Sequence, residues 1–524
     1  MDDIIETLAR MRNMGVRLWV EQGTLRYQAP KGTLTSRELA ALRELKADII
    51  RYLTRSPEAP VLPARLAARS PSDRVPLAFQ QQSWWNLFAP LGVAPGCSRS
   101  CASATRISGA LDLPRLQVSI EEVVRRHESL RTRIVRVDGY LLQYVDEARS
   151  FAVEVSDLSA MRCEDAQATA KRLIEEFVGE RIDVALGPLF AVRVLKLGPE
   201  EHVLVVALTG VVADGFSIGI LLREIWTWYR QLVHQLSASL AQMPMQFPDY
   251  AVWQYKTAEW WRDTHGPYWE QRLSGAVPAR FQTDGEPRPT GRIEAGAVPV
   301  RLGRQLSERL RELSRRHETS LVVTVLTAYV AAVLRWQRSR ELVLAFIVDG
   351  RHLPELANII GCMASQLYLS VQVSAQETLQ DLLRQVIEEY RLAWAHHDFG
   401  RLCVHSPGHD FRRSTSFNWP TWRGGIGATQ PGLSTPALTL DIEPFPFDTS
   451  DTSEEAESIA AALDRDPAIM LCDSAEGVCG SLSFRPDLFR SSTMEGLARN
   501  FRICAEQLVQ QPWARAVLVP GCRS

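Results

Sequence analysis

The loop Thr209–Gly215 is the stretch of the sequence whose composition and position could support chemistry. Asp214 is its one ionisable side chain, and the pair Asp214-Gly215 is a strong turn signal. The Val-rich apolar run before it, His202–Leu208, predicts a buried strand. From Ser217 onward, apolar residues recur at helical spacing, and Ser217 is placed to cap the first turn. A strand, a loop of small residues and a helix are a common way to present a site at the end of a sheet.

This loop resembles the central motif of the condensation domains of nonribosomal peptide synthetases, His-His-x-x-x-Asp-Gly. Asp214 and Gly215 match its last two positions, whereas Thr209 and Gly210 stand where the family has two histidines. In that family the second histidine faces the amine that attacks a thioester. Glycine has no side chain with which to move a proton, so the usual general-base or positioning role is absent at Gly210. The resemblance therefore implies a catalytic loop of atypical composition.

Other segments follow the same family in order along the chain. Pro76–Trp85 is similar to its opening motif, and Arg126–Thr132, which reads RHESLRT, is close to its RHExLRT segment. By this resemblance, Arg126 or Arg131 reaches Asp214 and holds the loop in shape. Asp214 would then be mainly structural, since a buried ion pair is costly to break. For His127 we expect a capping or surface hydrogen bond.

The resemblance also implies residues that line a tunnel between two lobes. Ser365 stands where the family has an asparagine, His397 lies in a segment similar to its HQDYPFE motif, and Asn418 and Trp419 match a strand near the tunnel. The implied fold class is α/β (α+β), with two chloramphenicol-acetyltransferase-like lobes in a V-shaped pseudo-dimer. The expected boundaries are residues 75–250 for the N-lobe, 251–515 for the C-lobe and 516–524 for a tail, with a crossover between the lobes in residues 262–300.

Residues 1–54 have the pattern of a small separate module, αββα(α), followed by a Pro-rich linker at residues 55–74. The stretch GVRLWVEQGTLRYQAPKGTLT resembles the TubC-like N-terminal docking domains of hybrid synthetases. That resemblance implies a hairpin edge that pairs with a short C-terminal segment of an upstream synthetase. Arg17, Arg26 and Lys31 would attract an acidic tail. The alternative is that these three cations form an ordinary solvated face of the hairpin.

Composition excludes several other classes of protein. The net charge of -2 gives no basic field for nucleic acid. The nine cysteines include no CxxC pair and no zinc-ligand spacing, which is typical of reduced thiols in a cytoplasmic protein. No window approaches the length of an apolar membrane span. A Walker loop and an HExxH motif are also missing, so a nucleotide-driven enzyme or a zincin lacks its minimal parts, and we expect no metal site.

Two functions of different classes remain open. The first is an acyltransferase that forms an amide or ester between substrates carried on the phosphopantetheine arms of donor and acceptor carrier proteins, with no cofactor bound by the domain itself. The second is an inactive condensation-like domain that docks an upstream partner and gates the assembly line. The heterocyclising branch of the family needs aspartates at both Thr209 and Asp214, and epimerising relatives keep both histidines, so both branches fit less well. Because the resemblance ends near the last residue, we also expect the chain to be part of a longer synthetase.

Overall fold

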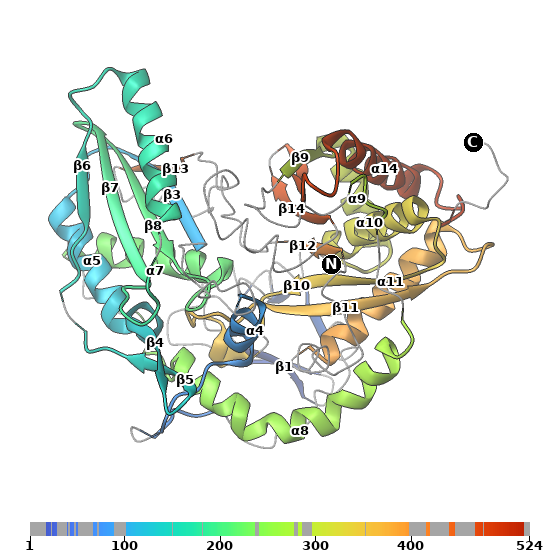
Figure 1. Cartoon of the computed structure of the whole chain (residues 1–524), viewed down its shortest axis with the longest axis horizontal. Helices are drawn as coiled ribbons and strands as arrows, with labels where there is room; N and C mark the ends of the chain where they lie inside the picture. Colours follow the sequence, from blue (N-terminus) through green and yellow to red (C-terminus); the bar gives the residue numbers. More distant parts are fainter. Residues whose placement is uncertain are drawn as a thin grey trace.

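The computed structural model describes most of the chain from residue 66 onward and a few residues before it. The described residues are parts of 17–50, then 66–70, 73–88, 101–148, 150–180, 182–235, 240, 242–276, 281–285, 296–351, 353–397, 415–419, 440–445, 467–474 and 476–517. Two lobes form the arms of a V, and one long helix, α8 (Phe247–Leu273), runs along the base between them (Figure 1). The α/β fold class with two lobes in a V is thus confirmed.

The N-lobe is built on a five-stranded sheet of order β13-β3-β8-β7-β6. Its central strand, β8 (Glu201–Leu208), has seven buried residues in succession, as the apolar run predicts. Helices α5 and α7 pack against one face of the sheet, and α6 packs against the other. The bounds of the remaining elements are β3 Cys101–Ser108, β6 Glu154–Asp157, β7 Phe190–Gly198, β13 Asp441–Pro444, α5 Leu113–Arg126, α6 Cys163–Gly179 and α7 Gly215–Val233.

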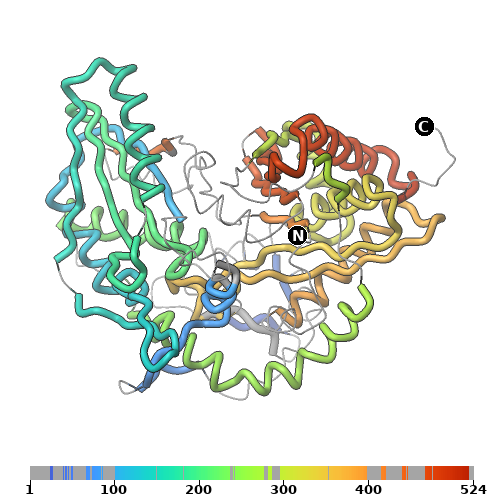
Figure 2. The backbone as a smooth tube through the Cα atoms, viewed as in Figure 1, coloured from blue at the N-terminus to red at the C-terminus, as the bar shows by residue number. Residues whose placement is uncertain are grey.

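One strand of the N-lobe sheet comes from the far end of the chain. The register of β13 on β3 is antiparallel, from Asp441 opposite Ser108 to Pro444 opposite Thr105. Figure 2 shows this orange-red segment at the inner edge of the left lobe, beside the blue strand β3. The two lobes are therefore joined by shared sheet structure as well as by α8.

The C-lobe is built on a six-stranded sheet of order β11-β10-β12-β14-β15-β9. Helices α9, α10, α11 and α14 pack with its strands in one large hydrophobic core. The C-lobe elements are β9 Gly296–Arg301, α9 Arg304–Arg316, α10 Leu321–Gln337, β10 Glu341–Val348, β11 Ser365–Gln372, α11 Leu379–Ala395, β12 Ser416–Asn418, β14 Ala468–Ser474, β15 Gly477–Phe484 and α14 Ser491–Gln510.

The crossover predicted at residues 262–300 begins later than expected. Helix α8 continues through Pro267 to Leu273, because Trp261, His265 and Trp269 are buried against the C-lobe and hold the helix past the proline. Tertiary packing here overrides a local helix-breaking signal.

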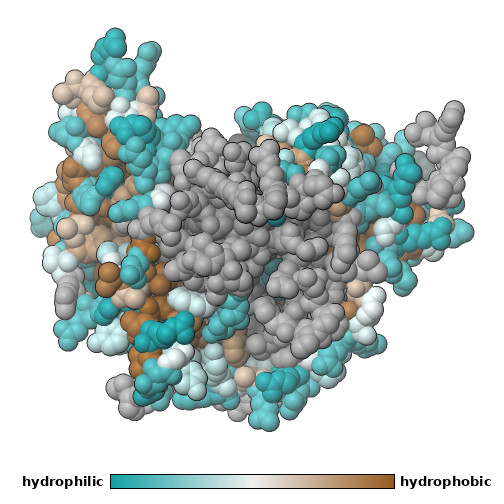
Figure 3. Space-filling model, viewed as in Figure 1, coloured by the Kyte–Doolittle hydropathy of each residue, from teal (hydrophilic) through white to brown (hydrophobic). Residues whose placement is uncertain are grey.

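A short ribbon, β4 (Thr132–Val137) and β5 (Tyr140–Val145), lies beneath the N-lobe sheet. Its inner face buries Ile134, whereas Tyr140 and Tyr144 on the outer face are 71% and 54% exposed. Figure 3 shows hydrophobic surface in this lower part of the left lobe.

Within the described residues, no single helix is long and apolar enough to cross a membrane, and only the bent pair α9 and α10 reaches that length and composition together.

Candidate functional site

Asp214 is the N-cap of helix α7. Its Oδ1 accepts hydrogen bonds from the backbone N–H of Ser217 at 2.9 Å and from the Ser217 hydroxyl at 2.8 Å, and its own N–H donates to Ser217 Oγ at 3.2 Å. This reciprocal arrangement is a capping box, in which the first and fourth residues satisfy each other. The prediction that Ser217 is the cap is therefore wrong. Ser217 lies at the third helical position, and Asp214 begins the helix.

Asp214 also forms a buried ion pair with Arg351, which follows β10 in the C-lobe. The guanidinium donates from Nη1 to Oδ2 at 2.8 Å and from Nη2 to Oδ1 at 3.0 Å, and both side chains are only 5–6% exposed. The prediction that Arg126 or Arg131 reaches Asp214 is therefore wrong. The physical reason is position, because Arg351 leaves the end of β10 directly beside the loop.

Arg126 and Arg131 support elements near the loop instead. Arg126 Nε donates to Glu224 Oε2 in α7 at 3.0 Å, and Arg131 donates to the backbone carbonyl of Asp146. Burial raises the pKa of Glu224, but the hydrogen bond from His127 and the charges of the neighbouring cations outweigh it, so that this pKa lies below its usual value. Arg126 thus ties α5 to α7.

His127 shares the same acceptor, with Nε2 at 2.8 Å from Glu224 Oε2. Its backbone N–H caps α5 by donating to Val123, as expected for a capping residue. The surface alternative is wrong, because the imidazole is 1% exposed.

The loop between β10 and β11 makes Asp214 a joint between the two lobes. Oδ2 of Asp214 accepts two further hydrogen bonds, from the backbone N–H groups of Met363 at 3.0 Å and Ala364 at 2.9 Å. Each carboxylate oxygen therefore accepts three hydrogen bonds. A carboxylate so fully occupied holds two lobes together and has no lone pair directed at a substrate proton.

The first two residues of the predicted catalytic loop are buried. Thr209 is 0% exposed, its N–H donates to Leu189 at 3.0 Å, and its Oγ1 has no hydrogen-bond partner among the described residues. Gly210 is also buried. The next residue, Val211, accepts a 2.7 Å hydrogen bond at its carbonyl from Gln81 Nε2. Before Asp214 the loop therefore offers backbone groups and one hydroxyl that has no partner among the described residues, and no ionisable side chain.

Ser365 lies directly beyond the two N–H groups that bind Asp214. Its Oγ accepts a hydrogen bond from Gln80 Nε2 at 3.1 Å, and Gln80 Oε1 accepts from Gln254 Nε2 at 3.1 Å. Gln254 also donates to the Tyr250 hydroxyl at 2.8 Å. This buried amide network was not predicted from the sequence. The run Gln80-Gln81-Gln82, next to apolar residues, was a signal that polar side chains are buried here.

The other predicted tunnel residues are divided between two places. Asn418 and Trp419 lie at the end of β12, which runs parallel to β10 and therefore ends at the same edge of the sheet as Arg351. His397 follows α11, and its Nδ1 is 2.7 Å from the carbonyl of Trp394 in a cluster of aromatic rings beside α8. The described contacts of His397 do not include the Asp214 loop. Its role in the tunnel stays a prediction.

The N-terminal residues include the predicted hairpin. Strands β1 (Arg17–Glu21) and β2 (Thr24–Gln28) pair antiparallel, with Trp19 opposite Arg26. Arg26 is exposed, and Lys31 and the first predicted helix lie outside the described residues. Leu42 and Ile49, which lie in the stretch after the hairpin where the αββα(α) pattern predicts a helix, are buried.

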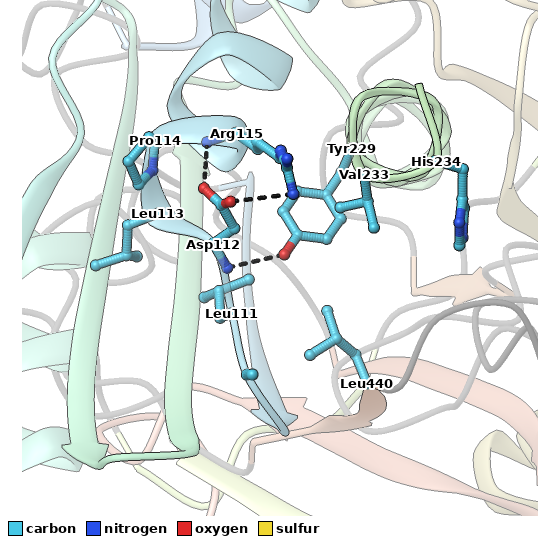
Figure 4. Close-up of a pocket in the computed structure, with 10 residues that line it drawn as sticks. Leu111, Asp112, Leu113, Pro114, Arg115, Tyr229, Val233, His234 and Leu440 are labelled. Atoms are coloured by element: carbon cyan, nitrogen blue, oxygen red, sulfur yellow. Dashed lines mark hydrogen bonds and ion pairs between the residues drawn. The ribbon is translucent and has the colours of Figure 1, made fainter. Parts of the chain in front are cut away.

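A separate hollow of about 700 Å³ lies at the far end of α7, between Leu111, Arg115, Val233 and Leu440 (Figure 4). The hydroxyl of Tyr229 accepts from the N–H of Asp112, and the Asp112 carboxylate caps α5. Because α7 has 19 residues, this hollow is on the order of 25 Å from Asp214. It is therefore not part of the loop site.

Among the described residues, no group of three or more potential metal ligands is close enough to hold a metal ion.

Residues 97–516 match the family model of the condensation domain. The chain belongs to the condensation domain family. Residues 4–55 match the model of the TubC N-terminal docking domain, so a docking domain precedes the condensation domain. The described fold agrees, since a two-lobed α/β architecture carries the Asp214-Gly215 loop at the junction of the lobes.

Curated relatives of this condensation domain are large synthetases. The chain is 28% identical to one of the linear gramicidin synthase proteins of Brevibacillus parabrevis over 453 residues, which is 86% of this chain and 8% of that protein. It is 26% identical to enniatin synthase of Fusarium equiseti over 415 residues, or 78% of this chain and 13% of that protein. The chain thus spans a small part of the length of these relatives.

Solved structures support the same fold. The X-domain from teicoplanin biosynthesis superposes with a TM-score of 0.69 at 23% identity, covering 86% of this chain and 99% of that one. The EpoB cyclization-docking bidomain from Sorangium cellulosum gives a TM-score of 0.66 at 18% identity, covering 98% of this chain and 99% of that one. The second likeness extends over the docking domain as well as both lobes.

Proposed function

We propose that this condensation domain joins an acyl donor and an acceptor, each carried on the phosphopantetheine arm of a carrier protein, by forming an amide or ester bond. The observation that carries the proposal is the match of residues 97–516 to the condensation domain family, and the Asp214–Arg351 joint keeps Thr209–Gly215 at the junction of the lobes, where such a reaction would take place. Holding two reactants in line is itself a large source of rate. A site that retains this geometry can promote acyl transfer by positioning alone, while the amine or a water molecule takes the role of base.

The second candidate is an inactive condensation-like domain that docks and gates. The observation in its favour is the composition and burial of the loop, because Thr209 and Gly210 are both buried and neither offers a base. Loss of a general base costs roughly two to four orders of magnitude in rate. The predicted site residues Thr209, Gly210, Asp214 and Gly215 would then serve folding only.

The experiment that separates the two candidates uses the full chain with donor and acceptor carrier proteins loaded with synthetic aminoacyl-phosphopantetheine arms. Intact-protein mass spectrometry of the acceptor carrier then detects a gain equal to the donor acyl group. Product above a reaction without this chain supports the first candidate. Product formation equal to that blank, across donors of different size, overturns it and supports the gating domain.

The docking domain is proposed to recruit the upstream partner. An acidic C-terminal segment of an upstream synthetase would add a strand to the β1–β2 hairpin and pair with Arg17, Arg26 and Lys31. The match to the docking-domain family and the exposure of Arg26 support this assignment.

A further inference from the structure

Two cysteines face each other across neighbouring strands of the C-lobe sheet. Cys472 in β14 and Cys479 in β15 are direct register partners, and the Cys479 thiol donates to Ser474 Oγ at 3.5 Å. Both are free cysteines. The Cβ atoms of directly opposed residues in antiparallel strands lie about 4.5–5.5 Å apart, and a disulfide needs about 3.5–4.5 Å. A small approach of the two side chains is therefore enough to link them.

These thiols lie on the face of β14 and β15 opposite to the side chains that pack into the C-lobe core. Leu471 and Val478, the residues next to them in each strand, are 0% exposed and pack into the C-lobe core. Successive side chains of a strand point to opposite faces, so Cys472 and Cys479 point away from that core. Both are half-buried, and Met470 on the same face is 42% exposed. Both thiols are therefore partly accessible to small reagents.

The pair is also close to the edge of the sheet that carries the Asp214 joint. Strands β10, β12 and β14 are parallel, with Phe346 opposite Phe417 and Asn418 opposite Met470. By this register Cys472 is level with the residue that follows β10, two residues before Arg351. Two strand spacings separate β14 from β10, which is about 10 Å. The thiol pair therefore lies along the edge of the sheet from which Arg351 reaches Asp214.

We propose that Cys472 and Cys479 form a redox modification site, at which a small-molecule disulfide such as oxidised glutathione converts the two thiols into a cross-strand disulfide. The first protein thiol loses its proton, attacks one sulfur of the reagent and releases one glutathione. The second protein thiol loses its proton, attacks the protein sulfur of the mixed disulfide and releases the second glutathione. The two cysteines are oxidised, one molecule of oxidised glutathione is reduced to two thiols, and the two released protons are taken up by the two glutathione thiolates.

The exchange begins from a thiolate, because the thiolate and not the thiol is the nucleophile. Burial and the neighbouring Cys479 raise the pKa of Cys472 to about 11. Once one of the two cysteines carries the mixed disulfide, its register partner is the adjacent nucleophile, so the second step is intramolecular.

The test treats the full chain with oxidised glutathione, blocks remaining thiols with an alkylating reagent, and digests the protein after glutamate residues. Cleavage after Glu476 separates Cys472 from Cys479, so a disulfide appears as two linked peptides that dithiothreitol releases. We expect this linked pair in the wild-type chain, with loss of alkylation at both cysteines. Alkylation of both cysteines, or a stable glutathione adduct on either one in the wild type, overturns the proposal.

Two variants separate the two steps. Cys472→Ser and Cys479→Ser each remove one thiol of the pair, so at least one of them should accumulate on its remaining cysteine a glutathione adduct that the wild type does not retain. Alkylation of the remaining cysteine with no adduct in both variants contradicts the proposed exchange. Cys163→Ser is the matched control, since Cys163 is an exposed thiol on α6 and its removal should leave the linked pair unchanged. None of these readouts depends on condensation activity, so they stand apart from the proposed function.

Discussion

Replacing Asp214 by alanine should destabilise the protein far more than replacing Arg351 by methionine. Asp214→Ala leaves the Arg351 charge buried without its partner and leaves the N–H groups of Ser217, Met363 and Ala364 without their acceptor. Arg351→Met leaves the carboxylate with its donors from Ser217, Met363 and Ala364. The order of the two effects follows from what each substitution leaves unpaired in the interior.

The magnitude follows from the burial of the pair. Breaking a buried ion pair from one side costs about 3–5 kcal/mol. A domain of 150–250 residues loses about 2–4 °C of melting temperature for each kcal/mol, so Asp214→Ala should melt on the order of 6–20 °C lower. Asp214→Asn should be nearly as damaging, because each carboxylate oxygen accepts three hydrogen bonds and the new amide N–H₂ would face donors wherever it is placed.

Thermal unfolding followed by circular dichroism measures all three variants, with Glu176→Ala as the control. Glu176 pairs with Arg172 on the surface of α6, where both side chains are more than half exposed, so its loss should change stability by under about 1 kcal/mol. A melting temperature for Asp214→Ala within the error of this control would refute the reasoning. An Arg351→Met variant less stable than Asp214→Ala would refute the order.

Three further predictions concern other parts of the chain. Gly210→His should fold, because the family places a histidine there, and it should raise or preserve condensation between loaded carriers if the site is active. Circular dichroism checks the folding, and the carrier assay checks the condensation. An inactive variant of an active wild type would mean that the substrate occupies the space left by Gly210. Burial lowers the pKa of His396 below 6.5, so its contribution to stability is complete above pH 6.5 and is lost as the pH falls through 6.5 toward the folded-state pKa. His396→Asn should therefore reduce the loss of melting temperature between about pH 7.5 and about pH 5.5. An unchanged loss would show that His396 does not cause this pH dependence. A variant with Arg17, Arg26 and Lys31 changed to glutamate should lose affinity for an acidic C-terminal peptide, and binding by the wild type should weaken as the salt concentration rises. Calorimetric titration measures both affinities. Equal binding by the variant would show that these cations are only a solvated face of the hairpin.

Local periodicity predicted the elements that bury one regular face. The spacing of the apolar residues in Leu113–Arg126 predicts an amphipathic helix, and this segment is α5. Leu116, Ile120, Val123 and Val124 are buried at helical spacing, and Asp112 caps the start of the helix. The buried strand at His202–Leu208 was predicted with one residue missing, since β8 begins at Glu201. In both elements the signal is local, so one sequence suffices.

Partners across the chain were not predictable in the same way. Arg351 is 137 residues from Asp214, and nothing in the spacing of either residue indicates the other. A buried carboxylate at Asp214 requires a cation nearby, and the sequence contains many arginines. The resemblance to the RHExLRT segment pointed to Arg126 and Arg131, which are the wrong two. The strand β13 has the same difficulty, because its four residues pair with β3 at the other end of the domain.

Because Asp214 has a structural role, its presence in the motif does not indicate whether the domain is active. Asp214 starts α7, receives Arg351 and accepts two backbone N–H groups of the C-lobe, and each of these contacts serves folding. A chain that lost catalysis would still need all of them to keep its lobes together. The informative motif positions are those whose side chains make no such contact among the described residues, and here they are Thr209, whose hydroxyl has no partner there, and Gly210, which has no side chain. Activity must therefore be tested at these two positions, where a substitution can change chemistry without removing the joint.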